Sequence, residues 1–426
     1  MSTKKIVASI ITIGDELLIG QTIDTNSAWM AQELNKVGIW VHRRLAVGDT
    51  WDAIWNALDA ESMHSDIILI TGGLGPTADD ITKPLLCEYF QGKMITDAGA
   101  LENVIDIFQK KLNRPLLERN LKQAEVPDVC TVIQNKRGTA PGMWFEKDTP
   151  SKKIFVSMPG VPHEMKGMML DNVIPSLQER FQIAPIAHRT LLTAGLGESF
   201  LAERIQDFEK ALPDFIKLAY LPNYGMVKLR LTLAETQISK LEILEQKFKQ
   251  LQEELADIIV INEDIPLHEV VGQQLKKINK TLGTAESCTG GYIAHLLTSP
   301  SGASQYFKGA IISYDNEVKE NILAVPSETL LKEGAVSEAT AASMLRGAFS
   351  QLKTDYALAV TGIMGPTGGT ETKPVGTVWV AVGNAQKMET RCFQFRFDRK
   401  RNIELTANSA LNMVRQFIAA DSSASI

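Results

Sequence analysis

Hydrophobic and polar residues form short periodic segments that predict alternating strands and helices in the first part of the chain. Residues 6–13 have the apolar character of a strand. The segment 66–70 (Asp-Ile-Ile-Leu-Ile), which is continuously apolar after its first residue, is typical of a buried strand. Between them, Asp24 or Thr25 can cap an amphipathic helix. Residues 1–170 are therefore expected to form one α/β domain.

The pattern changes in the middle of the chain. Residues 188–193 and 227–233 alternate between apolar and polar positions, which is typical of half-buried strands. Residues 199–208 and 240–255 have the spacing of amphipathic helices. We therefore expect a second, smaller α/β domain at 171–263.

The third part, residues 264–426, again alternates strand and helix. Strands are predicted at 278–285, 311–312 and 356–360, and each leads into a polar or glycine-rich segment. The carboxyl ends of parallel strands meet at one edge of a sheet, where open α/β folds bind their ligands. These strand ends are therefore expected to form one site.

The composition is that of a globular protein with several domains. Of 426 residues, 44% are hydrophobic and 22% are charged, and the net charge is −6. This length corresponds to about two or three domains. The negative charge argues against binding to nucleic acid through its phosphates, so nucleic acid is not expected as a partner.

Further sequence features bear on the cellular location. No apolar stretch approaches the length of a membrane span, and the polar break after Gly14 makes residues 1–13 a first strand rather than a signal peptide. The four cysteines are widely scattered and include no Cys-x-x-Cys pair. This spacing indicates reduced thiols and no structural zinc site, so we expect a cytoplasmic protein without membrane association.

The segment 286–291 (Glu-Ser-Cys-Thr-Gly-Gly) joins the strand at 278–285 to a helix and carries two kinds of nucleophile, Ser287 and Cys288. Backbone N–H groups at the start of a helix favour an anion, whether a bound phosphate or an oxyanion formed during reaction. The glycines allow a ligand to approach the backbone closely. A segment of this kind on its own is more often an ordinary tight turn. The polar or glycine-rich ends of the other two predicted strands favour a ligand-binding or catalytic site instead.

These strand ends carry motifs that resemble a known family. Residues 285–291, 313–319 (Ser-Tyr-Asp-Asn-Glu-Val-Lys) and 361–366 (Thr-Gly-Ile-Met-Gly-Pro) look like the C-terminal domain of CinA-like proteins, and the resemblance covers essentially the whole chain. It implies nicotinamide mononucleotide deamidase activity, which produces nicotinate mononucleotide and ammonia in pyridine nucleotide recycling. It also implies a deamidation that uses no metal and no organic cofactor.

A serine nucleophile needs a base, and none of the six histidines lies in these motifs. A partly desolvated lysine can take this role, and Lys319 is the lysine that the motif supplies. The resemblance maps the catalytic serine onto Ser287, with Tyr314 and Lys319 assisting. The expected substrate-binding residues are Glu286, Thr289, Gly290, Thr361, Gly362 and Arg401.

Several assignments in this site stay open. Cys288 is the rival nucleophile, because a thiol is intrinsically stronger and a helix N-terminus lowers its pKa. Glu286 can be an orienting acid or a cap of the following helix. Backbone N–H groups at 288–290 are the expected oxyanion donors. Thr361 and Arg401 are expected to orient the amide or to bind the nucleotide phosphate.

The N-terminal domain resembles the molybdopterin-binding-like fold of the same family. In some members this domain cleaves ADP-ribose, so the resemblance implies ADP-ribose as a second ligand and a divalent metal as its cofactor. The glycine-rich loop after the strand at 66–70 carries adjacent acids at a helix start, where Asp79 can be a cap or a ligand. The candidate ligand and metal residues are Asp15, Glu16, Asn26, Gly73, Thr77, Asp79, Asp80 and Thr82.

The middle segment resembles the small KH-like domain of the family. Residues 194–198 (Ala-Gly-Leu-Gly-Glu) lack the basic Gly-x-x-Gly clamp with which KH domains hold RNA. We therefore interpret this domain as a spacer or a dimerisation module, and the resemblance implies a homodimer.

Two other classes of function compete with the deamidase. One is a non-catalytic nucleotide- or pterin-binding regulatory protein linked to competence. The other is a metal-dependent pyrophosphatase whose C-terminal domain is secondary. An inactive deamidase should lack Ser287, Lys319 or Arg401, and all are present. The metal dependence of activity on each substrate separates the alternatives.

Overall fold

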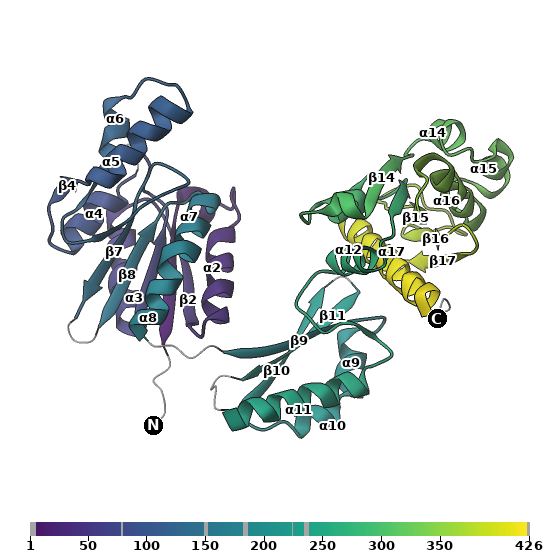
Figure 1. The fold of residues 1–426 in the computed structure, drawn as a ribbon, viewed down its shortest axis with the longest axis horizontal. Coiled ribbons are helices and arrows are strands. Elements are labelled where there is room, and N and C mark those ends of the chain that lie inside the picture. Colours follow the sequence, from purple (N-terminus) through teal and green to yellow (C-terminus); the bar gives the residue numbers. More distant parts are fainter. Residues whose placement is uncertain are drawn as a thin grey trace. The chain divides into compact units, whose positions relative to one another are not determined.

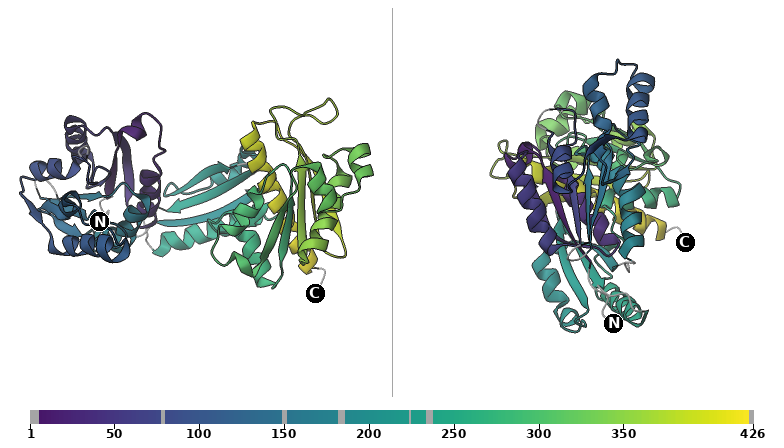
Figure 2. Two further views of the ribbon diagram at one scale, coloured as in Figure 1. Left: turned by 90° about the horizontal axis from the view of Figure 1, so that it is seen from above. Right: turned by 90° about the vertical axis from the view of Figure 1, so that its left-hand side faces the viewer.

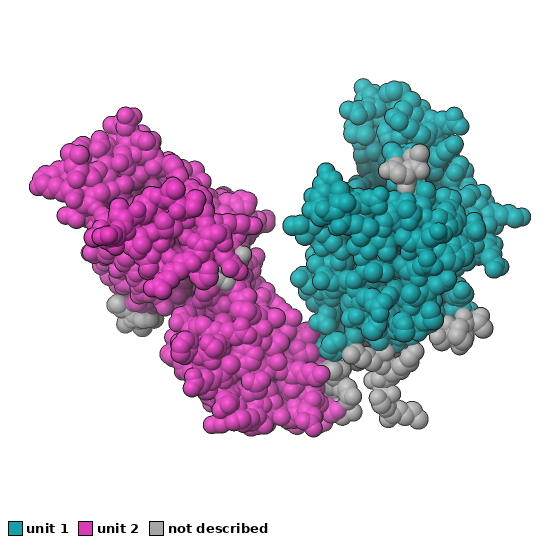
Figure 3. All heavy atoms as spheres, turned by 180° about the vertical axis from the view of Figure 1, so that it is seen from behind, with its two compact units in different colours: residues 1–187, 234–238 teal, residues 188–233, 239–426 magenta. Residues whose placement is uncertain are grey.

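The computed structural model describes residues 6–77, 80–148, 152–181, 186–223, 225–233 and 238–423. The chain divides into two compact units, residues 1–187 with 234–238 and residues 188–233 with 239–426 (Figure 3). Each unit contains both helices and strands (Figure 1). None of the helices within the described ranges has the length and apolar character that crossing a membrane requires.

The first unit begins with the predicted strand and the helix that follows it. Its strands are β1 (Val7–Ile13), β2 (Trp40–Val47), β3 (Ile67–Thr71), β4 (Met94–Thr96), β5 (Glu125–Pro127), β6 (Thr131–Ile133), β7 (Gly142–Lys147) and β8 (Lys153–Met158). Its helices are α1 (Asp15–Leu18), α2 (Thr25–Lys36), α3 (Trp51–His64), α4 (Thr82–Tyr89), α5 (Ala98–Ile105), α6 (Glu118–Leu121), α7 (Pro162–Met168) and α8 (Ile174–Phe181). As predicted, Asp24 caps α2, because its side chain accepts a hydrogen bond from the Ser27 N–H at 2.9 Å.

In the main sheet of this unit, the described strands have the spatial order β2-β1-β3-β8-β7-β6. The strands from β2 to β8 are parallel, whereas β7 and β6 run antiparallel to their neighbours. The carboxyl ends of β1, β3 and β8 therefore lie side by side, at the edge where the sequence places the N-terminal candidate residues.

Both faces of this sheet are covered. Along β3, Ile67 and Leu69 pack in one core with α2, α7 and α8, and Ile68 and Ile70 pack in another with α3 and α4. Successive residues of a strand point to opposite faces, so a strand that is buried on both sides is apolar at every position. This accounts for the uninterrupted apolar run at 67–70.

The first domain extends beyond the boundary expected at 170/171. Ile174 and Leu177 of α8 are buried in the same core as α2 and α7, and the compact unit continues to residue 187. Residues 169–173 join α7 to α8 as a helical segment. An amphipathic helix such as α8 can cover the domain on either side of it, so its sequence pattern does not decide where the domain ends.

The middle domain belongs to the second unit. Its elements are β9 (Ala187–Ala194), α9 (Glu198–Arg204), α10 (Gln206–Lys210), β10 (Ile216–Asn223), β11 (Met226–Leu233), α11 (Ile238–Glu254) and β12 (Ile259–Ile261). Among the described residues the sheet has the order β10-β11-β9-β12, and β10 and β11 form an antiparallel pair. The single helix predicted at 199–208 is divided into α9 and α10, with Ile205 between them.

The C-terminal domain completes the second unit. Its strands are β13 (Leu282–Glu286), β14 (Phe307–Ile312), β15 (Tyr356–Gly362), β16 (Thr377–Gly383) and β17 (Met388–Gln394). Its helices are α12 (Leu267–Lys277), α13 (Tyr292–Thr298), α14 (Asn316–Asn321), α15 (Ser327–Glu333), α16 (Glu338–Leu352) and α17 (Arg399–Ser423). The described strands have the order β14-β13-β15-β16-β17, and β13 is parallel to both of its neighbours. The prediction that these strand ends share one edge is therefore confirmed.

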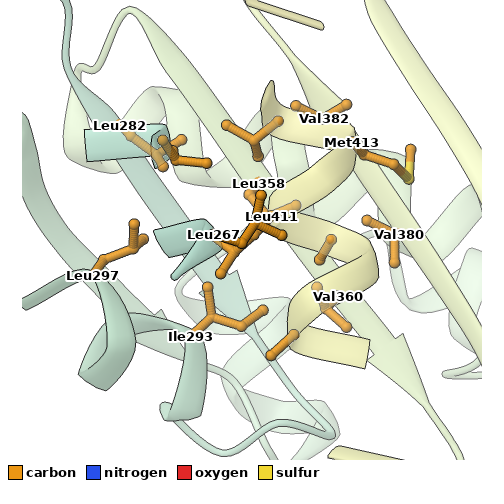
Figure 4. Close-up of a cluster of buried hydrophobic side chains, with 14 of the residues drawn as sticks. Leu267, Leu282, Ile293, Leu297, Leu358, Val360, Val380, Val382, Leu411 and Met413 are labelled. Atoms are coloured by element: carbon orange, nitrogen blue, oxygen red, sulfur yellow. The ribbon is translucent and has the colours of Figure 1, made fainter. Parts of the chain in front are cut away.

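Helices cover both faces of this sheet (Figure 2). Leu358 and Val360 of β15 pack against α12, α13 and α17, and Leu411 of α17 lies among the buried side chains on this face (Figure 4). Ala357 and Ala359 point to the opposite face, where α16 packs. The small alanine side chains let α16 pack close to the strands.

The middle and C-terminal domains share part of their core. Leu192, Met226 and Val260 of the middle domain are buried in one cluster with Leu267 and Val271 of α12. A common hydrophobic core explains why these two domains form a single compact unit.

Candidate active site

Ser287 lies directly after β13, at the edge where the ends of β13, β14 and β15 meet. Its backbone N–H donates a hydrogen bond to the Val360 carbonyl at 3.0 Å, which ties the turn to β15. The residue is only 7% exposed and borders a cavity of about 180 Å³. The described residues that line this cavity are Ser287, Cys288, Tyr314, Asn316, Lys319, Ala335, Val336, Thr361, Gly362, Met364 and Arg399.

The cavity brings together residues that are far apart in the sequence. The predicted catalytic residues Ser287, Tyr314 and Lys319 all line it, as do the predicted substrate-binding residues Thr361 and Gly362. They come from the exits of parallel neighbouring strands, which explains why three distant motifs contribute to one place.

Lys319 is buried beside the end of β14. Its Nζ donates to the carbonyls of Ser313 at 2.8 Å and Tyr314 at 3.0 Å, with a longer contact to the Asp315 carbonyl at 3.4 Å. Burial lowers the pKa of Lys319 from its ordinary value of 10.5, and the charge of Asp315 opposes this shift only in part. Among the described groups, Nζ has no hydrogen bond to Ser287. Hydrogen bonds between catalytic groups are often long before substrate binds.

Tyr314 and Arg399 stand together in the same cavity. The Arg399 guanidinium donates to the Tyr314 hydroxyl at 3.0 Å and to the Gly365 carbonyl at 2.9 Å. Tyr314 is 61% exposed, so its ring is accessible to solvent. Because the hydroxyl accepts from Arg399, its own O–H remains able to donate to a ligand.

Glu286 is a helix cap, which settles one of the open alternatives. It is fully buried, and its carboxylate accepts hydrogen bonds from the start of α13. Its donors are Thr284 Oγ1, Thr289 Oγ1 and the backbone N–H groups of Gly291, Ile293 and Ala294. The expectation that the helix N-terminus is free to hold a substrate anion is therefore wrong, because an internal carboxylate already occupies it.

Two amides of the preceding turn remain free. The N–H groups of Cys288 and Thr289 donate to no acceptor within the described parts of the chain, whereas the Gly290 N–H donates to the Ser287 carbonyl at 3.1 Å. Free amides beside a nucleophile can stabilise an oxyanion. The expected donor set at 288–290 is therefore reduced to its first two members.

The Cys288 thiol does not have the environment of a reactive cysteine. It is buried among hydrophobic side chains, and this burial raises its pKa to about 12. The nearby Glu286 charge acts in the same direction, while Lys319 opposes it. A thiolate at Cys288 would need stabilisation by the N-terminus of α13, and the Glu286 carboxylate already occupies that N-terminus.

The arginine in the cavity is Arg399, which the sequence analysis did not select. Arg401, the predicted residue, lines a different cavity. Helix α17 begins at Arg399. Asp398, just before it, accepts hydrogen bonds from the backbone N–H groups of Arg401 and Asn402. Residues two apart on a helix lie about 200° apart around its axis, so both arginines cannot face one site.

Thr361 and the remaining predicted binding residues have different surroundings. The Thr361 hydroxyl donates to the Ala335 carbonyl at 2.7 Å, which positions another segment that lines the cavity. Thr289 donates its hydroxyl to Glu286 at 2.7 Å. Gly290 has a φ of +60°, which the tight turn requires and glycine adopts readily. Neither Thr289 nor Gly290 is among the residues that line the cavity.

The N-terminal candidates gather around the ends of β1 and β3. Asn26 Nδ2 donates to the Gly160 carbonyl at 2.7 Å, while Asn26 Oδ1 is buried and has no hydrogen-bond partner among the described atoms. The Thr82 hydroxyl is likewise buried and unpartnered there, and a side chain at Gly73 would collide with it at 2.1 Å. Buried polar atoms without partners are uncommon and can mark a place where a ligand or water binds.

The acidic N-terminal candidates form local hydrogen bonds. Asp80 accepts from the backbone N–H groups of Gly75 at 2.7 Å and Thr77 at 2.9 Å, so it organises its own loop. Asp15 is exposed, and its carboxylate accepts from the Asp49 N–H at 3.2 Å.

The described acids of the N-terminal domain do not form a set of ligands for the expected divalent metal. Within the described ranges, no group of at least three His, Cys, Asp or Glu side chains is arranged to hold a metal ion. Glu16 is exposed near Asp15, and Asp79 lies outside the described residues. The described acids therefore do not by themselves fit a metal centre.

Comparison with known proteins agrees with this domain order. The chain matches the models for a probable molybdopterin binding domain at residues 9–179, the damage-inducible protein CinA KH domain at 188–260 and the CinA C-terminal domain at 264–418. A CinA-like protein of Cytophaga hutchinsonii is 44% identical over 412 residues, which cover 96% of this chain and 98% of that protein. A CinA-like protein of Flavobacterium psychrophilum is 44% identical over 410 residues, with coverage of 96% and 97%.

Solved structures resemble individual parts of the chain. A CinA superfamily protein from Klebsiella pneumoniae is 31% identical and covers 37% of this chain and 99% of its own, with a TM-score of 0.35. The near-complete coverage of the full-length relatives establishes the family, and it confirms the predicted α/β architecture with a molybdopterin-binding-like, a KH-like and a C-terminal domain. The chain therefore belongs to the family of CinA-like proteins.

Proposed function

We propose that the C-terminal domain is an amidohydrolase that converts nicotinamide mononucleotide to nicotinate mononucleotide and ammonia. The observation that carries this proposal is the shared cavity of Ser287 and the buried Lys319, beside the free amides of Cys288 and Thr289. A nucleophile, a base and oxyanion donors are the groups that acyl transfer from an amide requires.

The first half of the reaction forms an ester. Ser287 Oγ attacks the carboxamide carbon while neutral Lys319 accepts the hydroxyl proton. The amides of Cys288 and Thr289 donate hydrogen bonds to the oxyanion that forms. The C–N bond then breaks. The leaving nitrogen takes the proton from the Lys319 ammonium and departs as ammonia, which returns Lys319 to its neutral form.

The second half consumes water. A water molecule attacks the ester carbon and gives its proton to Lys319, and cleavage of the ester returns the proton to Ser287 Oγ. The product is the free carboxylic acid, which ionises at neutral pH. Every proton transfer in this cycle uses a side chain of the cavity, and we therefore expect no requirement for a metal or an organic cofactor.

The size of the cavity indicates how the substrate lies in it. A volume of about 180 Å³ is smaller than the roughly 300 Å³ at which small-molecule pockets usually begin. The pyridine ring and its carboxamide are expected to enter the cavity, with the ribose phosphate across its mouth. Arg399, which holds the exposed Tyr314 hydroxyl there, supplies a positive charge for the phosphate.

A substrate panel tests this function. Ammonia release should be measured from nicotinamide mononucleotide, nicotinamide riboside and free nicotinamide, with and without EDTA. We expect the mononucleotide to react best and free nicotinamide scarcely to react, because binding of the ribose phosphate orients the amide. EDTA should not change the rate. Equal turnover of free nicotinamide, or a strict metal requirement, would contradict the proposed site.

We propose hydrolysis of ADP-ribose as a second activity, located in the N-terminal domain. Asn26 Oδ1 and Thr82 Oγ1 are buried and have no hydrogen-bond partner among the described atoms, and Thr82 lies next to Gly73. These two oxygens favour a small-molecule site at this sheet edge. The test is ADP-ribose hydrolysis by wild type and Thr82→Val, each assayed with and without a divalent metal. Loss of this activity with unchanged ammonia release would support separate sites, whereas undiminished hydrolysis by Thr82→Val would count against this location.

A further inference from the structure

A larger cavity lies within the second unit, between the middle and C-terminal domains. Its volume is about 790 Å³, inside the range of roughly 300–1,000 Å³ that is typical of ligand pockets. The middle domain contributes the loop 195–198, residues 222–223 of β10 and residues 225–227 at the start of β11. The C-terminal domain contributes Phe397, Arg401 and Leu405. None of the described residues that line it also lines the Ser287 cavity, so the two cavities are distinct.

Two of the four residues that the loop 195–198 contributes to this cavity are glycines. A Cβ atom added to Gly195 or Gly197 would meet no atom within 4 Å, so open space adjoins both residues. Gly195 has a φ of +98°, which favours glycine, whereas Gly197 is extended at φ −73°. A ligand can therefore approach the peptide groups of this loop closely.

The opposite wall combines an aromatic ring with a cation. The Arg401 guanidinium lies over the Phe397 ring at 5.6 Å from its centroid, and Phe397 is 52% exposed. Arg401 forms no ion pair with a carboxylate in the described parts of the chain, so its charge is available to a ligand. An exposed ring stacks on planar bases, and a guanidinium binds phosphate.

This wall is held in place by a buried side chain. Asn402 is fully buried, donates to the carbonyls of Phe397 at 2.9 Å and Met364 at 3.1 Å, and accepts from the Phe397 N–H at 3.2 Å. The backbone of Phe397 is therefore fixed before a ligand binds, which reduces the entropic cost of binding.

We propose that this cavity binds a nucleoside monophosphate. The base stacks on Phe397, the phosphate pairs with Arg401, and the exposed Glu198 carboxylate at the end of the glycine loop accepts from the ribose hydroxyls. The apolar side chains of Met226 and Leu405 line the rest of the cavity and exclude water from the base. This site is independent of the deamidase function, because no step of that reaction uses these residues.

Calorimetric titration of the full-length chain with AMP tests the proposal, with ribose 5-phosphate and inorganic phosphate as further probes. Two variants alter the cavity by different means. Arg401→Gln removes the charge, and Gly197→Leu places a side chain in the open space at a residue whose φ any amino acid can adopt. Lys400→Gln is the matched control, because Lys400 lies on the same turn but lines neither cavity.

We expect AMP to bind the wild type and Lys400→Gln equally, and ribose 5-phosphate and phosphate to bind more weakly because they lack the base. Arg401→Gln should weaken AMP binding to this cavity roughly tenfold or more. Gly197→Leu should abolish binding to this cavity, while any AMP held at the N-terminal ADP-ribose site should be retained. Both variants should retain the wild-type circular dichroism and melting temperature to within a few degrees, which shows that they fold. Absence of AMP binding to the wild type, or equal affinity in all four proteins, would overturn the proposal.

Discussion

The carboxylate of Glu286 accepts a hydrogen bond from the Ala294 N–H at 2.8 Å, across the turn that carries Ser287. Glu286 is fully buried and is the last residue of β13, and Ala294 lies in the first turn of α13. The contact therefore joins the strand to the helix on either side of the nucleophile. The Glu286 carboxylate holds the start of α13 in place, so the amides that remain free to bind an oxyanion are those of Cys288 and Thr289 among the described residues.

Glu286→Gln should destabilise the protein without creating a new charge. In the wild type, several buried donors share the two oxygens of the Glu286 carboxylate. Glutamine replaces one of these oxygens with an NH₂ group, so some of the donors lose their acceptor. We expect a loss of about 2–4 kcal/mol in the free energy of unfolding, measured by urea denaturation. Glu317→Gln, at an exposed position near the start of α14, is the control and should change stability by less than about 0.5 kcal/mol. Unchanged stability together with lost activity would instead indicate that Glu286 contacts the substrate.

The pH dependence should report the buried base. Burial lowers the pKa of Lys319 from 10.5, and the neutral amine is the form that accepts a proton. The value of kcat/KM should therefore rise as pH rises through this lowered pKa and level off below 10.5. Lys319→Arg should lose both the activity and this rise, because a guanidinium does not give up its proton at working pH. A rate that continues to increase above pH 10.5 would assign the base role to another group.

Cys288 should prove dispensable for the chemistry. With a pKa of about 12, only about one thiol in ten thousand is ionised at pH 8. Cys288→Ala should therefore keep most of the activity. The deamidase activity of the native wild type should persist in iodoacetamide at pH 8, because Cys288 is buried, whereas the exposed Cys392 can be alkylated. A wild type that is rapidly inactivated by alkylation at Cys288, or an inactive Cys288→Ser variant that is still folded, would favour a thiolate mechanism.

Arg399 should act mainly on the phosphate. Arg399→Gln should lower kcat/KM for nicotinamide mononucleotide roughly tenfold to a hundredfold, as expected for the loss of a charged hydrogen bond. The effect on nicotinamide riboside should be smaller, because this compound lacks the phosphate. Lys400→Gln, the neighbouring basic residue outside the cavity, serves as the control. Equal losses on both substrates would place the role of Arg399 at Tyr314 rather than at the phosphate.

Much of the fold could be predicted because the periodic patterns are strong. The apolar run at 67–70 is continuous because both faces of β3 are covered. The strand ends in the C-terminal domain converge because β14, β13 and β15 are parallel neighbours. The end of the first domain could not be read in this way. Helix α8 is amphipathic, and only its packing against α2 and α7 shows to which domain it belongs.

The sequence pattern did not indicate which arginine lines the Ser287 cavity. Arg399 and Arg401 belong to one basic cluster, and the packing of α17 decides that Arg399 lines the Ser287 cavity while Arg401 lines another. The start of α17 depends on capping by Asp398, an interaction that the hydrophobic pattern does not encode. Similarly, the sequence shows that Glu286 stands at a strand end, and the folded chain shows that its carboxylate is used internally.

The most direct test of the proposed reaction is the rate of ammonia release from nicotinamide mononucleotide by Ser287→Ala. The substitution removes one hydroxyl from a residue whose backbone N–H still bonds to Val360, so the fold and substrate binding should persist. We predict a rate lower than that of the wild type by roughly a thousandfold or more, with substrate binding retained in calorimetry. A folded Ser287→Ala variant that releases ammonia at nearly the wild-type rate would contradict the assignment of Ser287 as the nucleophile.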